Sequence, residues 1–293
     1  MPHVRSVSVG VWVGVGSRAE SPAEGGISHF MEHMLFKGTE RRTAAQIASE
    51  MDALGGNLNA YTTREYTCYY AKSIDEDIEA VFDILSDMYM HSRLGETETE
   101  LERGVILEEI SMYEDSPEDV VQESLAKLAF GDDPLGYGIA GTRETVSGIT
   151  ARHLRAFQKK YYTADNTVLA IAGNFDEEKV LELAEKYFGA LSGGEVFTDY
   201  ASVPFCAGSI TKTKDIEQTH IAIGYPGLSQ EDPDKYVMAA FAGALGGGMS
   251  SRLFQKIREE KGLAYSIYAS PEGFKNAGML NIYAGTSPEN ADL

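Results

Sequence analysis

His29-Phe30-Met31-Glu32-His33 places two imidazoles and one carboxylate within five residues, in a stretch whose pattern predicts a helix. Residues four positions apart lie on the same face of an α-helix, because four steps of 100° leave only about 40° between them. His29 and His33 can therefore bind one metal ion from adjacent turns, with Glu32 close enough to act on a water at that metal. Two satisfied surface histidines on an ordinary helix are the alternative interpretation. The spacing H-x-x-E-H favours the metal site, because it inverts the zinc-binding helix motif H-E-x-x-H.

A third ligand is expected in the acidic run Glu96–Glu118. Zinc that keeps an open position for water usually has three protein ligands. Helical periodicity in this run places Glu102 and Glu109 on related faces, since seven residues make two turns. Most of the other acids are expected on a solvated face. Composition alone does not choose between Glu108 and Glu109.

Two segments resemble the pitrilysin family of inverzincin zinc metallopeptidases, which includes bacterial processing proteases and the mitochondrial processing peptidase. They are Gly25–Thr39, which contains H-x-x-E-H, and Glu102–Glu109. The resemblance extends along nearly the whole chain. It implies a zinc-dependent endopeptidase that hydrolyses extended or unfolded peptides. A non-catalytic peptide-binding subunit, or an inactive fragment of such a peptidase, is the alternative function, and the metal motif alone also permits a hydrolase of another class.

The resemblance implies a role for each residue around the metal. His29, His33 and Glu109 become the ligands of one Zn²⁺ per chain. Glu32 becomes the catalytic general base, acting on a zinc-bound water. Glu102 is implied as an accessory catalytic-site group that orients a histidine.

Four further residues are implied in substrate binding. Asn59 and Ala60 match the family's edge strand, against which an extended peptide pairs through its backbone. Arg258 and Tyr265, seven residues apart, match a pair that reaches bound substrate. In that role Tyr265 stabilises the oxyanion and Arg258 holds the peptide backbone, so both also count as catalytic residues. By its residue type and neighbours alone, Arg258 belongs to an ordinary charged helix face.

The first part of the chain predicts alternating strands and helices. Valines at every second position from Val7 to Val15 predict a strand, and Ser28 is the expected N-cap of the metal-binding helix. Thr43–Leu54 follows as a capped helix, and Asn57–Lys72 as a hairpin. Further elements are predicted as helices at about 75–91, 97–114, 117–129, 150–161 and 177–188, with a buried strand at 168–172.

The plan restarts after a predicted linker at Leu191–Pro204. A strand at 220–225, helices at 234–245 and 251–260, and a strand at 263–269 repeat the opening order, without a second H-x-x-E-H. The fold class is therefore α+β, with two related domains of mostly antiparallel sheet and packed helices facing across a cleft. Residues 1–192 are the expected zinc-binding domain, its first strands missing, and 205–293 a partial, truncated, metal-free second domain that contributes substrate contacts.

Composition narrows the class of protein. The 293 residues are 43% hydrophobic and carry a net charge of −20, which argues against nucleic-acid binding. Such acidity usually serves solubility. The sharper hypothesis is that acids around the cleft attract basic peptides, as the resemblance implies for some members of the family. No signal peptide or membrane span is evident, so a cytoplasmic location is expected. Cys68 and Cys206 are expected to be small core residues rather than a disulfide framework. A homodimer, or a heterodimer with a related subunit, is the expected assembly.

Overall fold

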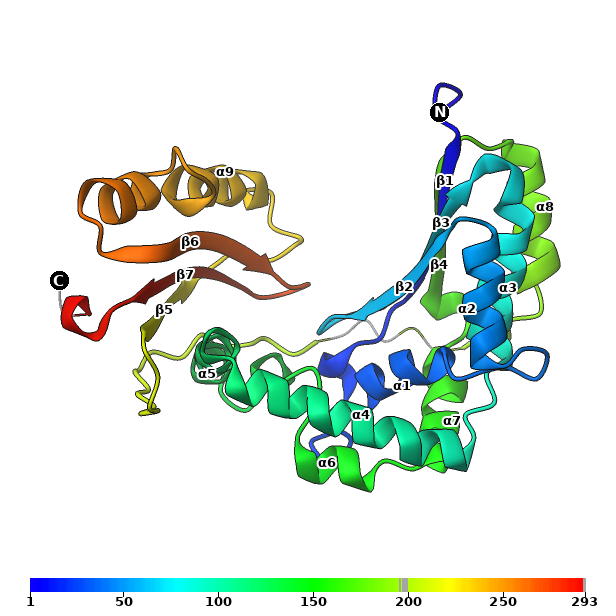
Figure 1. Ribbon diagram of the computed structural model, residues 1–293, viewed down its shortest axis with the longest axis horizontal. Coiled ribbons are helices and arrows are strands. Elements are labelled where there is room, and N and C mark those ends of the chain that lie inside the picture. Colours follow the sequence, from blue (N-terminus) through cyan, green and yellow to red (C-terminus); the bar gives the residue numbers. More distant parts are fainter. Residues whose placement is uncertain (195, 197–199, 292–293) are drawn as a thin grey trace. The chain divides into compact units, whose positions relative to one another are not determined.

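The computed structural model describes residues 1–194, 196 and 200–291 (Figure 1). The chain forms two compact units, Met1–Ile110 with Gly138–Thr198, and Ser111–Tyr137 with Asp199–Leu293. The sequence-based division left Ser111–Tyr137 in the first domain. This segment belongs with the second unit because its helix packs against a strand of that unit.

The first unit is built on an antiparallel sheet whose strand order is β2-β3-β1-β4. Its strands are β1 (Ser6–Val13), β2 (Asn57–Thr62), β3 (Thr67–Ile74) and β4 (Thr167–Gly173). The alternating valines of β1 are fully buried on one face, as the period-2 pattern predicts. The predicted hairpin is β2 and β3, with β2 at the sheet edge.

Helices cover the face on which those valines lie. α3 (Ile78–His91) packs on β1 and β3, and α8 (Glu177–Phe188) packs on α3. Figure 1 shows α2 (Ala44–Ala53) on this same side of the sheet. The Thr43–Gln46 capping box that starts α2 forms as predicted.

The metal-motif helix is α1 (Ile27–Leu35), which contacts β2, β3 and α7 (Ala151–Tyr161). The prediction that Ser28 is its N-cap is wrong. The N-cap is Gly26, at a φ of 90° that favours glycine. Because glycine has no side chain, the cap residue cannot accept a hydrogen bond from the amides of the first turn. The buried carboxylate of Glu20 accepts the first-turn amides instead, a contact from outside the local window that capping rules use.

α4 (Glu96–Asp115) is the long acidic helix that carries both further site glutamates. Its end at Asp115 lies beyond Ile110, so the helix runs from the first unit into the second. The short helix α6 (Arg143–Gly148), which periodicity did not predict, follows in the first unit. Arg103 of α4 donates to the backbone carbonyls of Val146 and Ile149 at the end of α6.

The second unit repeats the order of the first on a smaller scale. Its antiparallel sheet has the order β5-β7-β6, from β5 (Thr219–Pro226), β6 (Ala264–Gly273) and β7 (Gly278–Thr286). This order matches β1-β3-β2 of the first sheet, with β5 in the place of β1, β7 in that of β3 and β6 in that of β2. α9 (Lys235–Gly246) packs on β6, and α5 (Pro117–Phe130) packs on β5. The antiparallel α+β prediction is confirmed.

Two local predictions in this half change. The predicted helix 251–260 forms as a π-helix over Phe254–Glu260, with wider turns than an α-helix. The predicted linker Leu191–Pro204 lies partly outside the described residues. The described residues from 200 to 218 form neither helix nor strand.

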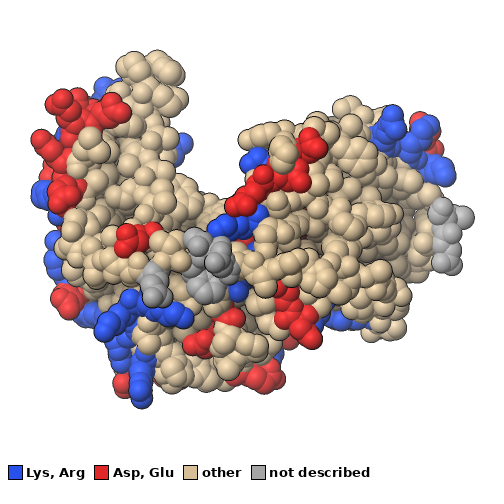
Figure 2. All heavy atoms as spheres, turned by 180° about the vertical axis from the view of Figure 1, so that it is seen from behind, with Lys and Arg blue, Asp and Glu red and all other residues tan. Residues whose placement is uncertain are grey.

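The two cysteines differ in their exposure to solvent. Cys68 is buried as expected, whereas Cys206 is exposed, so the core prediction is wrong for the second cysteine. Charged side chains on the face in Figure 2 form separate groups of either sign between wide uncharged areas. Among the described residues, no helix combines the length and the apolar character that a membrane span requires.

Candidate metal and catalytic site

The donor atoms of His29, His33 and Glu109 meet within the first unit. Glu109 Oε2 lies 3.7 Å from His29 Nε2 and 3.4 Å from His33 Nε2, and the three donors all lie within 4.8 Å of one another. Tetrahedral zinc with bonds of about 2.0–2.1 Å separates its ligand atoms by roughly 3.4 Å. Two imidazole nitrogens and one carboxylate oxygen at this spacing fit a zinc ion. Glu108, the other candidate of the sequence, is exposed and lies outside this group.

His29 has the protonation state that a metal ligand needs. Burial, followed by the neighbouring His33, lowers the pKa of His29 to about 4. The ring is therefore neutral near pH 7, with a lone pair free to bind a cation.

Glu102 contacts the second histidine, in a position that suits the orienting role that the family resemblance implies. Its Oε1 accepts a hydrogen bond from His33 Nδ1 at 2.8 Å, and its Oε2 lies 2.7 Å from Lys37 Nζ. Burial opposes ionisation of Glu102, but the hydrogen bonds from His33 and Lys37 outweigh it and hold the pKa below the ordinary value. An ionised Glu102 keeps the proton on Nδ1, so the lone pair of His33 Nε2 points toward Glu109. Sequence reasoning missed Lys37, although it stands one helical turn after His33.

Replacing Glu102 by glutamine is therefore expected to weaken zinc binding by about 10- to 100-fold, because the His33 ring loses its anionic partner. Competition of the purified protein with a fluorescent zinc chelator measures the affinity. Glu100→Gln is the matched control, since the Glu100 side chain on the same helix is 70% exposed and pairs with Arg103. Equal zinc affinity of Glu102→Gln and the control would contradict the orienting role.

Glu32 lies beside the donor group and is held by the end of β2. The Thr62 hydroxyl donates a hydrogen bond to Glu32 Oε2. Burial raises the pKa of Glu32 above the ordinary glutamate value, and the bond from Thr62 opposes part of that rise. A carboxylate with a raised pKa is a stronger base than an exposed one, which suits proton transfer.

Two buried charges that sequence reasoning missed fix the start of α1 and the hairpin. Glu20 is only 7% exposed and accepts from the backbone amides of Gly26 and Ser28, both at 2.7 Å. Burial raises its pKa to about 7. Two residues earlier, the buried Arg18 side chain pairs with Glu65 in the β2–β3 turn. No local motif signals either contact, because each partner is brought in by the fold.

Asn59 and Ala60 lie on β2, the edge strand of the first sheet. Asn59 Oδ1 accepts the backbone amide of Ala60 at 2.9 Å. An edge strand can pair with an added strand through its backbone, so the position suits the implied peptide contact.

Arg258 and Tyr265 meet within the second unit. Arg258 Nη1 donates to the backbone carbonyl of Tyr265 at 2.8 Å, and its guanidinium carbon lies 4.6 Å from the ring centres of both Tyr265 and Phe254. These contacts fix the backbone and ring of Tyr265, which stays 76% exposed. The metal donors belong to the first unit, and this pair belongs to the second.

Comparison with known families covers almost the whole chain. Residues 1–143 match the family described as Insulinase (Peptidase family M16), and residues 148–293 match the Peptidase M16 inactive domain. In fold, the chain is similar to a protease from Helicobacter pylori (TM-score 0.92, 24% identity, covering 97% of this chain and 70% of that one). It is also similar to a peptidase M16 inactive domain from Pseudomonas fluorescens (TM-score 0.93, 20% identity, 99% and 71%).

Curated relatives are closer in sequence. The uncharacterized zinc protease YmxG of Bacillus subtilis is 45% identical over 97% of this chain and 69% of its own length. An uncharacterized zinc protease of Streptomyces coelicolor is 43% identical over 98% of this chain and 64% of its own length. The chain thus spans about two thirds of the length of these relatives. With both parts matched and this level of identity, the chain belongs to peptidase family M16, the insulinase family.

Proposed function

We propose that this chain carries the active site of a zinc-dependent endopeptidase that cleaves extended or unfolded peptides. The observation that carries the proposal is Glu32, a half-buried carboxylate that Thr62 holds beside a donor group that fits zinc. A merely structural zinc site has no need of such a base.

The chain's own residues have distinct tasks in this reaction. His29, His33 and Glu109 would hold the zinc, with Glu102 and Lys37 fixing the His33 ring. Bound zinc supplies a Lewis acid that lowers the pKa of its water to near 7. Glu32 accepts the proton of the attacking water and returns it to the leaving amine nitrogen.

Substrate contacts are proposed from both units. Asn59 and Ala60 on the β2 edge would pair with the peptide backbone, which selects an extended conformation more than a sequence. Tyr265 would stabilise the oxyanion, and Arg258 would hold the peptide backbone and the Tyr265 ring. Three further expectations stay predictions: that the substrates are basic peptides, that the chain forms a dimer with a like or related subunit, and that the protein is cytoplasmic.

A non-catalytic peptide-binding subunit is the second candidate function. The match of residues 148–293 to the inactive domain favours it only for that part of the chain, because Met1–Ile110 hold the donors and Glu32. Catalysis by the first unit is therefore the function that the site supports best.

Hydrolysis of an internally quenched, unstructured peptide tests the proposal. We expect cleavage by the zinc-loaded protein, loss of cleavage with a chelator, and recovery when zinc is added back. Tight zinc binding and peptide binding without cleavage would identify the non-catalytic alternative instead.

A further inference from the structure

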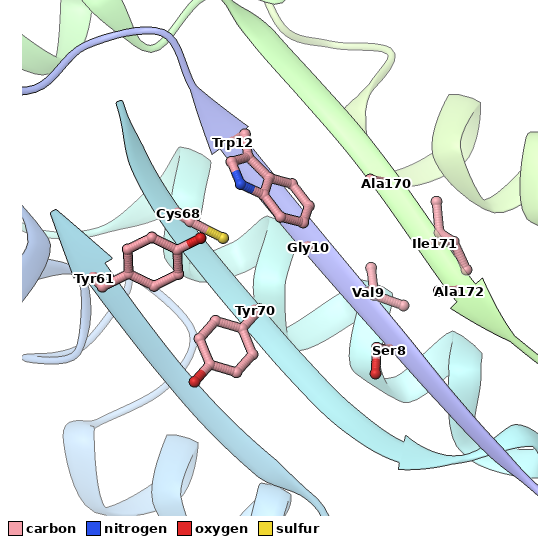
Figure 3. Close-up of a pocket in the computed structure, with 10 residues that line it drawn as sticks. All are labelled: Ser8, Val9, Gly10, Trp12, Tyr61, Cys68, Tyr70, Ala170, Ile171 and Ala172. Atoms are coloured by element: carbon pink, nitrogen blue, oxygen red, sulfur yellow. The ribbon is translucent and has the colours of Figure 1, made fainter. Parts of the chain in front are cut away.

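Glu32 and His33 are each fixed by a side chain from another element. Glu102 of α4 contacts the His33 ring, and Thr62, the last residue of β2, donates a hydrogen bond to Glu32. Figure 3 shows the ring of the preceding residue, Tyr61, which lies on the opposite face of the same strand. Both contacts come from outside α1, so they hold these two side chains against the rest of the first unit.

His29 has no such hydrogen bond on its ring. Its Nδ1 atom is buried, and no protein group in the described part of the chain (residues 1–194, 196 and 200–291) forms a hydrogen bond with it. The donor group uses the other ring nitrogen, Nε2. Because His29 is the third residue of α1, the position of its ring depends on where the backbone of α1 begins.

A loop at residues 138–142 packs backbone against backbone on the residues just before α1. A Cβ atom at Gly141 would lie 2.3 Å from the carbonyl oxygen of Gly25, and a Cβ atom at Gly26 would lie 2.5 Å from the carbonyl oxygen of Ala140. Gly26 and Gly141 both have a positive φ, of 90° and 76°. Any other residue at either position would bring a Cβ atom into the opposite backbone, so this close approach requires glycine on both sides.

The same loop is connected to α4. Thr142, at its end, is the N-cap of α6 and forms a capping box with the first turn of that helix. Arg103 of α4 donates to two backbone carbonyls at the end of α6. Residues 138–149 therefore link the start of the helix that carries His29 to the helix that carries Glu109.

The geometry points to Gly141 as a positioning residue for His29. By letting the loop lie directly on the start of α1, it sets the separation of His29 Nε2 and Glu109 Oε2, which is 3.7 Å. This inference rests on the proposed function for the identity of the bound ion, zinc. Metal–ligand distances in zinc sites vary by only about 0.2 Å, so a small displacement of α1 weakens the donor group.

Gly141→Ala tests this role, with Gly55→Ala as the matched control. Both variants replace a glycine of positive φ, but a Cβ atom at Gly55 would have no other atom within 4 Å. The control therefore carries the backbone strain of such a substitution without displacing a neighbouring segment.

We expect Gly141→Ala to bind zinc about tenfold more weakly or worse, and Gly55→Ala to bind it as tightly as the unmodified protein. Competition with a fluorescent zinc chelator measures the affinity. Co²⁺ in place of zinc gives a second readout, because its visible absorption depends on the arrangement of its ligands, and only Gly141→Ala should change that spectrum. Both assays use conditions in which circular dichroism shows the metal-free proteins to be folded, since unfolding would itself lower the apparent affinity.

Arg103→Met acts on the same connection without straining the backbone. It keeps the stem of the side chain but removes both hydrogen bonds to α6, and it is also expected to weaken zinc binding. Glu100→Gln is its control, because this change removes a partner of Arg103 and leaves the bonds to α6.

Zinc affinities and Co²⁺ spectra equal to those of the controls, with only a lower free energy of unfolding, would overturn the positioning role. Should Gly141→Ala not fold, equal zinc affinity of Arg103→Met and Glu100→Gln would overturn it by itself.

The outcome is separable from that of the proposed function. Peptide cleavage by the unmodified protein, together with unchanged zinc binding in both variants, would leave the peptidase standing and remove the role of Gly141. Zinc binding that weakens in the variants of a protein that cleaves no peptide would support the role of Gly141 and remove the peptidase.

Discussion

Glu32→Gln is expected to lower the rate of peptide hydrolysis by about 10²- to 10⁴-fold, the usual contribution of a positioned general base. Glutamine has nearly the same shape and can still accept the hydrogen bond from Thr62, but it cannot take a proton from water. The loss should appear in kcat, while KM changes little, because the base acts on the reacting atoms rather than on substrate binding. Initial rates with a quenched peptide measure both constants.

Zinc content separates this loss from a damaged metal site. The variant should retain the same zinc as the unmodified protein, since Glu32 lies outside the donor group. Glu108→Gln serves as the control, because Glu108 is an exposed glutamate next to Glu109, the proposed ligand. If Glu32→Gln hydrolysed the peptide at nearly the rate of Glu108→Gln, Glu32 could not be the base.

Glu20→Ala is expected to destabilise the fold by about 2–4 kcal/mol at pH 4.5, because two buried amides at the start of α1 lose their acceptor. The cost should shrink as the pH rises. Burial raises the pKa of Glu20 from 4.5 to about 7, so the folded state binds this proton more tightly than the unfolded state. Between these pH values the unmodified protein loses about 3 kcal/mol of unfolding free energy as Glu20 ionises, and the alanine variant does not.

Urea unfolding followed by circular dichroism, at several pH values from 4.5 to 8 and with chelator present throughout, measures this difference. Other titrating groups, His29 among them, act equally in both proteins and cancel. Asp52→Ala, at an exposed position of α2, is the control and should show only a small cost. A cost of Glu20→Ala that is independent of pH would mean that Glu20 is ionised throughout this range in the folded protein.

The helix that carries His29 and His33 could be predicted because its spacing is a local property of the chain. The same is true of the strand β1, whose alternating valines encode both the strand and its buried face. For the third metal ligand, the helical period leaves Glu108 and Glu109 as candidates. Only the family resemblance favours Glu109 over Glu108. In the structure, burial distinguishes the two, since only Glu109 turns toward the histidines.

The contacts that support the site could not be predicted from local patterns. Ser28 has the right residue type and position for an N-cap, yet Glu20 takes the amides through a loop whose path depends on the whole fold. Arg18 meets Glu65 across 47 positions of the chain for the same reason. The place of α5 with the second unit is likewise decided by packing against β5, a strand about 100 residues later.

The hydrogen bond from Thr62 to Glu32 connects the strand proposed to bind the peptide backbone with the carboxylate proposed as the general base. β2 is an edge strand with a pairing partner on one side only, and its last residue steers the carboxylate. A peptide chain laid along the open side would complete the ladder and stiffen that strand. In the proposed peptidase, this strand would then be best ordered only while an unfolded chain is aligned along it. A compact protein, with no free backbone to offer, would leave the base less well held and so escape cleavage.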